Sequence, residues 1–200
     1  MLIISHRVNT IAELKNTPYK YGIEIDLRDY NGEIILQHDP YINGDSLKTF
    51  LQNYNHSFII LNIKSERIEF QVLEIINLFK IENYFFLDSS IPMINNLINL
   101  GERNIAIRYS EYESIETVIN FSNKVKYVWV DCFHKYILTN DVFKILKNNN
   151  FLICIVSPEL QNRESDVNTY IDFLNNNSIK PDFVCTKSGF IELWQNFTNL

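Results

Sequence analysis

The sequence predicts an α/β fold, a single compact (β/α)8 TIM barrel in one domain over residues 1–200. Short apolar runs alternate with amphipathic stretches along the chain. The runs are continuously apolar, which is typical of strands buried on both faces of a parallel sheet. Eight such strands with helices between them are what the barrel requires. A doubly wound open sheet is the alternative, although no glycine-rich stretch follows the first run to bind a dinucleotide.

The expected strands are rich in Ile, Val and Phe. They cover residues 2–5, 23–27, 58–63, 84–87, 105–108, 127–130, 152–156 and 183–185. The pair Asn31-Gly32 predicts a tight turn, and we expect residues 34–37 to form a hairpin with the second strand.

Helices are expected between these strands. Residues 66–80 place Ile68, Val72, Ile75 and Ile76 on one face at helical spacing. The other expected helices cover residues 91–100, 114–121, 140–149 and 164–176.

The composition indicates a globular, acidic protein. Hydrophobic residues make up 46% of the chain and charged residues 21%, which excludes a disordered chain because enough apolar surface is present for a core. A formal net charge of -6 argues against a nucleic-acid partner, because such proteins neutralise phosphates with basic residues.

Cysteine usage and the amino terminus indicate a cytoplasmic location. Cys132, Cys154 and Cys185 show no CxxC spacing, and we expect them to be buried and reduced rather than bound to zinc. The first apolar stretch is too short for a signal peptide, and no integral membrane segment is expected. The sequence does not predict an oligomeric state.

Ionisable residues follow almost every expected strand. The carboxyl ends of barrel strands meet at one rim, where catalytic groups lie. The residues at these ends include His6, Arg7, His38, Asp39, Lys64, Asp88, Arg108, Asp131, Glu159 and Lys187. We expect Asp39 to be a turn residue, whereas Arg108, Asp131, Glu159 and Lys187 are candidate rim contacts.

Glu24 and Asp26 lie two residues apart on one strand, so their side chains share a face. Two carboxylates on an inward face repel each other unless a cation lies between them, and Mg2+ or Ca2+ takes such oxygen ligands. Asn62 could add a neutral oxygen ligand. Lys64 has the same spacing from Asn62 and could hold a phosphate oxygen.

His6 and His38 both end strands. Because imidazole titrates near neutral pH, the two could give and take protons on opposite sides of a reacting phosphorus. Arg7 has the planar guanidinium that matches a phosphate.

These residues, in this order, resemble the glycerophosphodiester phosphodiesterase family. The family shows HRG, then a glycine before ExD, a DG turn before HD, and ExK; here the corresponding segments are His6-Arg7, Gly22 to Asp26, Gly32 to Asp39, and Asn62 to Lys64. The motifs cover residues 1–64. The sequence is also similar to sphingomyelinase D-type phospholipases, which share a His-x-Val-Asn start.

The resemblance implies a barrel that hydrolyses a small phosphodiester with a divalent cation, Mg2+ or Ca2+. It makes His6 and His38 the acid/base pair. The implied metal ligands are Glu24 and Asp26, with Arg7 and Lys64 as phosphate contacts.

Three departures from the family pattern affect these expectations. Val8 replaces a glycine, and Asn62 stands where a third metal-binding glutamate is expected. The chain between Asp39 and Asn62 is too short for the family's usual insertion. Two alternatives therefore stay open: a barrel that binds a phosphorylated ligand without turnover, and a lyase that forms a cyclic phosphate.

Overall fold

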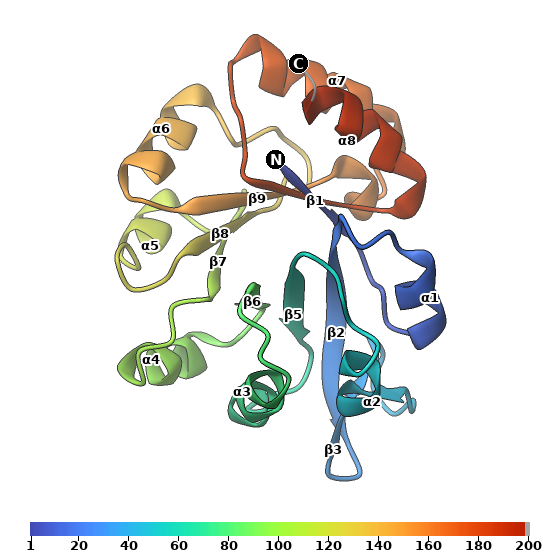
Figure 1. Ribbon diagram of the computed structural model, residues 1–200. Coiled ribbons are helices and arrows are strands. Elements are labelled where there is room, and N and C mark those ends of the chain that lie inside the picture. Colours follow the sequence, from blue (N-terminus) through green and yellow to red (C-terminus); the bar gives the residue numbers. More distant parts are fainter. Residues whose placement is uncertain (199–200) are drawn as a thin grey trace. The chain divides into compact units, whose positions relative to one another are not determined.

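The computed structural model describes residues 1–198 and divides the chain into two compact units. One unit contains residues 5–101, and the other contains residues 1–4 and 102–198. Strands alternate with helices in both units (Figure 1). The α/β class predicted from the sequence is therefore confirmed.

The unit of residues 5–101 contains a mixed sheet. Strands β2 (Gly22–Tyr30), β5 (Ile59–Ile63) and β6 (Tyr84–Leu87) are parallel neighbours. Strand β3 (Glu33–Leu36) is antiparallel to β2 and to the short β4 (Asp45–Ser46). The β2–β3 turn has φ 49° at Asn31 and 84° at Gly32, as expected of a tight hairpin turn at Asn-Gly.

Four helices belong to this unit. They are α1 (Ile11–Asn16), α2 (Leu47–Leu51), α3 (Glu69–Leu78) and α4 (Ile91–Asn99). Helix α3 begins later than predicted, because Arg67 has φ 69° in a turn that a right-handed helix cannot include. Helices α1 and α2, and strand β4, were not predicted; all three are too short for a clear periodic pattern.

The other unit contains the parallel strands β7 (Ala106–Tyr109), β8 (Tyr127–Val130), β9 (Leu152–Val156) and β10 (Phe183–Thr186), paired in this order. Strand β1 (Leu2–Ser5) begins the chain. The helices are α5 (Ile115–Ile119), α6 (Asn140–Asn148), α7 (Val167–Asn176) and α8 (Ile191–Thr198). Three 3-10 helices complete the unit: η1 (Pro158–Gln161), η2 (Glu164–Asp166) and η3 (Ser188–Phe190).

Two features of the second unit differ from the prediction. Residues 164–166, expected to open an α-helix, form η2 instead, and α8 was not predicted. The three cysteines are buried and make no disulfide, as expected. In the described part of the chain, no helix has the length and apolar character needed to cross a membrane.

Apolar residues of strands and helices fill both cores. Ile25, Leu27 and Phe86 are fully buried in the first unit, and Tyr170 and Trp194 in the second. Burying side chains of this size contributes about 1.5–3 kcal/mol each. This packing fixes the strands whose polar residues are described next.

Candidate active site

Strand β2 carries the two acidic residues of the candidate site. Glu24 and Asp26 are 0% and 1% exposed and lie on the same face of the strand, as the alternation of side chains predicted. Ile23, Ile25 and Leu27 face the opposite side and are fully buried. The apolar residues thus anchor the strand while the carboxylates face the polar groups of neighbouring segments.

Glu24 contacts both His6 and Asn62. Its Oε2 accepts a hydrogen bond from the backbone N of Arg7 at 2.7 Å and lies 3.7 Å from Nε2 of His6. Its Oε1 accepts a hydrogen bond from Nδ2 of Asn62 at 2.8 Å. Complete burial, and then the negative charge of Asp26, raise the pKa of Glu24 to about 7 in the metal-free protein.

Asp26 lies between two basic side chains. Its Oδ2 accepts a hydrogen bond from Nδ2 of Asn9 at 2.8 Å and lies 3.5 Å from Nε of Arg7. Its Oδ1 lies 3.7 Å from Nζ of Lys64, which also donates to Asp88 at 3.1 Å. Arg7 and Lys64, the two predicted phosphate contacts, are therefore held near one buried carboxylate.

His38 follows β3 and is oriented by the residue after it. Its Nδ1 lies 2.8 Å from Oδ1 of Asp39, so Nε2 is left to face a ligand. The hydrogen bond with His38 lowers the pKa of Asp39, which keeps this carboxylate ionised at neutral pH. Asp39 is exposed, as expected of a turn residue, and it also orients the imidazole of His38.

Arg28 joins the two segments that carry His38 and Lys64. Its Nε donates to the backbone O of His38 at 3.0 Å, and its guanidinium also donates to the backbone O of Lys64 at 2.8 Å. One side chain therefore connects the segment after β3 with the residue after β5.

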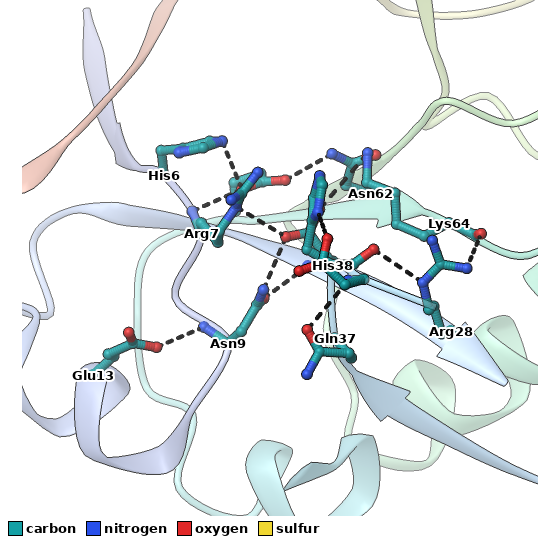
Figure 2. Close-up of polar contacts among 12 residues, drawn as sticks. His6, Arg7, Asn9, Glu13, Arg28, Gln37, His38, Asn62 and Lys64 are labelled. Carbon is teal, nitrogen blue, oxygen red and sulfur yellow. Dashed lines mark hydrogen bonds and ion pairs between the residues drawn. The ribbon is translucent and has the colours of Figure 1, made fainter. Parts of the chain in front are cut away.

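All seven residues predicted as catalytic, metal-binding or phosphate-binding lie in the unit of residues 5–101. Figure 2 labels His6, Arg7, His38, Asn62 and Lys64 among them. The seven are His6, Arg7, Glu24, Asp26, His38, Asn62 and Lys64. Six of them are joined by the contacts around Glu24 and Asp26. His38 is not part of these contacts, but it lines the same pocket as Arg7.

This pocket has a volume of about 540 Å³, within the range of small-molecule sites. Its walls come from the residues at the start of α1 and from the segment after β3, which includes Gln37, Asn43 and Asp45. Gly44 is required in this segment, because a Cβ there would lie 2.1 Å from the backbone O of Leu36. The short segment after β3 therefore builds a wall of the pocket.

The oxygen atoms near Glu24 fit a hard divalent cation. Asn62 is 8% exposed, and its Oδ1 is buried without a hydrogen-bond partner among residues 1–198. Two carboxylates and an amide oxygen are ligands that Mg2+ and Ca2+ accept. Within the same residues no three His, Cys, Asp or Glu side chains form a metal site, so Asn62 would have to supply the third protein ligand.

The four predicted rim contacts lie in the other unit and form two groups there. Arg108 pairs with the fully buried Asp131, which also accepts a hydrogen bond from Gln161 at 2.8 Å. Glu159, also fully buried, accepts a hydrogen bond from the backbone N of Lys187 at 2.9 Å. These carboxylates hold neighbouring segments together, so a structural role accounts for their contacts.

Sequence reasoning assigned no site role to Asn9, Arg28 or Asp39. For Arg28 a signal was present, because it continues the alternation of Glu24 and Asp26 on β2. Asn9 and Asp39 lie close in sequence to His6 and His38, but the sequence does not show where their side chains point.

Solved structures similar to this chain are known, although no family model and no curated protein matches the sequence. One is a structure from Agrobacterium tumefaciens described as a glycerophosphoryl diester phosphodiesterase, with a TM-score of 0.71 and 13% identity over 100% of this chain and 99% of that one. A glycerophosphodiester phosphodiesterase of the same organism has a TM-score of 0.69 and 11% identity, with 100% of both chains covered. A glycerophosphoryl diester phosphodiesterase of Parabacteroides distasonis has a TM-score of 0.69 and 13% identity, over 99% of this chain and 86% of that one.

These similarities establish the fold. Each extends over essentially the whole chain, so the fold is that of TIM-barrel glycerophosphodiester phosphodiesterases, which confirms the barrel class and excludes the doubly wound alternative. At 11–13% identity they do not by themselves assign an activity.

Proposed function

We propose that this protein is a metal-dependent phosphodiesterase that hydrolyses a small phosphodiester, with His6 and His38 as the acid/base pair. The observation that carries the proposal is the contact of His6 with the buried Glu24. The neighbouring carboxylate of Asp26 pairs with the side chains of Arg7 and Lys64. Buried carboxylates are costly unless they are paired or coordinate a metal. The names of the structurally similar proteins agree with this chemistry.

Glu24, Asp26 and the unpartnered Oδ1 of Asn62 would hold the divalent cation, Mg2+ or Ca2+. When bound, such a cation neutralises charge that develops on the phosphate oxygens. It would also counteract burial and the charge of Asp26, which raise the pKa of Glu24, because the carboxylate would then face a positive charge.

Arg7 and Lys64 would bind the phosphate through its non-bridging oxygens. Both side chains are partly exposed and positioned by Asp26, so they are present at the site before substrate binds. Groups placed in advance around developing charge stabilise the transition state without reorganisation.

In the reaction, His6 takes a proton from the attacking water and His38 gives a proton to the departing alcohol. Asp39 suits His38 for the second task, because an ionised carboxylate on Nδ1 fixes the ring with Nε2 toward substrate. Acid/base catalysis of this kind contributes about 10²–10⁴-fold to the rate. The opposite assignment of the two histidines is distinguished by the pH dependence of each single variant.

The test is a panel of phosphodiesters incubated with the purified protein and Mg2+ or Ca2+, with products followed by phosphorus NMR. We expect phosphate monoesters, and we expect Glu24→Ala to lose an activity that extra metal does not restore. His134→Asn is the matched control, because His134 is exposed and lies outside the motifs. A cyclic phosphate as final product would indicate the lyase, and binding without turnover would indicate a ligand-binding barrel. The cytoplasmic location stays a prediction from the sequence.

A further inference from the structure

We propose that the pocket beside His38 and Arg7 binds the departing alcohol, and that it selects alcohols carrying N–H or O–H donors over alkyl groups. This inference rests on the proposed phosphodiesterase function. It names the chemistry of the substrate, which the catalytic residues alone leave open.

The pocket's position assigns it to the alcohol. His38 and Arg7 line it, and both also belong to the group that would act on the phosphate. A group in this pocket is therefore joined to phosphorus through the ester oxygen nearest His38. The bond from phosphorus to that oxygen breaks, its electron pair stays on the oxygen, and His38 supplies the proton; water forms the new bond to phosphorus and gives its proton to His6.

Most of the side chains that line the pocket carry polar groups. Leu36 is the single large apolar side chain among the described residues that line it; carboxylate, amide, hydroxyl and guanidinium groups supply most of the rest. Ligand pockets are usually lined mainly by apolar side chains, with few polar groups. An alkyl chain here would strip water from these groups without replacing their hydrogen bonds, which is unfavourable.

Each of three carboxylates in the lining uses only one of its two oxygens in hydrogen bonds within the described residues. Oδ2 of Asp45 accepts from the backbone N of Ile11 at 2.9 Å, and Oε2 of Glu13 accepts from the backbone N of Asn9 and of Thr10 at 3.0 Å each. Oδ1 of Asp39 lies on His38. Within residues 1–198 no side chain or backbone group donates to the second oxygen of each, so a ligand that brings donors can bind there in place of water.

These acceptors are also fixed in place. Glu13 is held by the capping box at the start of α1, and Asp45 is tied to the same helix by its bond to Ile11. Acceptors that are already oriented discriminate between ligands, because no side chain must be ordered when the ligand binds.

The test compares four methyl phosphodiesters, those of ethanolamine, glycerol, choline and 1-butanol. The methyl group is small, so only the second alcohol can fill the pocket. Ethanolamine and choline carry the same charge, but only ethanolamine has N–H donors; glycerol offers O–H donors without charge. We expect kcat/KM for the ethanolamine and glycerol esters to exceed that for the choline and butyl esters about tenfold or more. Comparing kcat/KM of the ethanolamine ester with that of the glycerol ester then shows whether the pocket prefers N–H or O–H donors.

Asp45→Asn tests the pocket directly, because the asparagine can still accept from the backbone N of Ile11. It should raise KM for the donor-bearing esters about ten- to a hundred-fold, the effect of losing a hydrogen bond to a charged group, and leave the butyl ester unchanged. Glu33→Gln, at the exposed end of the β2–β3 hairpin, is the matched control. Equal rates for all four esters, or an equal loss for all four in Asp45→Asn, would overturn the proposal.

Failure of the phosphodiesterase function has a different signature. In that case none of the four esters, nor the unselective substrate bis(4-nitrophenyl) phosphate, is cleaved. The pocket is then judged by NMR titration of wild type and Asp45→Asn with the same esters. Weaker binding of the ethanolamine and glycerol esters by the variant supports the pocket, and unchanged binding contradicts it.

Discussion

Replacing Glu24 by glutamine should stabilise the metal-free protein at alkaline pH while abolishing its catalytic activity. Burial and the charge of Asp26 raise the pKa of Glu24 from 4.5 to about 7. A folded-state pKa above the unfolded value means that the folded state binds more protons between these two pH values. The contribution of Glu24 to the free energy of unfolding of the wild type should therefore fall as pH rises from 4.5 to about 7, and the full loss should persist above that pH.

The size of the effect follows from the two pKa values. At 1.36 kcal/mol for each pKa unit, the ionised Glu24 costs the metal-free protein about 3 kcal/mol above pH 7. Glutamine removes the charge and keeps the hydrogen bonds, because Asn62 can rotate its amide and offer its unpartnered Oδ1 to the new NH2 group. The oxygen of the glutamine can still accept from the backbone N of Arg7.

The assay is urea unfolding in EDTA from pH 4 to pH 8, with Glu33→Gln as the exposed control. We expect Glu24→Gln to match the wild type at pH 4 and to exceed it by about 3 kcal/mol at pH 8, the full effect of the raised pKa. Adding Mg2+ or Ca2+ at pH 8 should stabilise the wild type and not the variant. A variant that is less stable than the wild type at pH 8, or a stability difference between the two proteins that does not grow between pH 4.5 and 7, would refute this reasoning.

Two further substitutions test the segments around the site. The lysine of Arg28→Lys can donate to one of the carbonyl groups of His38 and Lys64 but cannot span both. We therefore expect kcat to fall about tenfold while the melting temperature stays nearly unchanged. A loss of kcat that is matched by a fall in the melting temperature would show a merely structural role. Gly44→Ala forces its Cβ against the backbone O of Leu36, which should cost about 1–3 kcal/mol of stability in thermal unfolding, and an unchanged melting temperature would contradict the close approach.

Much of the fold could be predicted from the sequence, because buried parallel strands leave a strong local signal. The runs at 2–5, 84–87, 127–130 and 152–156 match the observed strands residue for residue. Elements decided by tertiary packing left a weaker signal. Helix α1, for example, buries only Leu14, so six residues carry no readable period.

The candidate site could be predicted as residue types and not as a network. Spacing placed Glu24 and Asp26 on one face, and the structure agrees. The contact of Lys64 with Asp26, and the bonds from Arg28 to two backbone carbonyls, depend on which strands are neighbours. Side-chain direction after a strand end is set by the turn that follows, as at Arg7 with φ 56°, and no pattern in the sequence specifies it.

The roles of His6 and His38 are the centre of this account, and one rate comparison tests them most directly. Initial rates of diester cleavage with Mg2+ would be measured for the wild type, His6→Asn and His38→Asn, with folding of each checked by circular dichroism. We expect the wild type to release a phosphate monoester and each variant to be about 10²-fold slower or more. Variants that cleave as fast as the wild type would contradict catalysis by this pair.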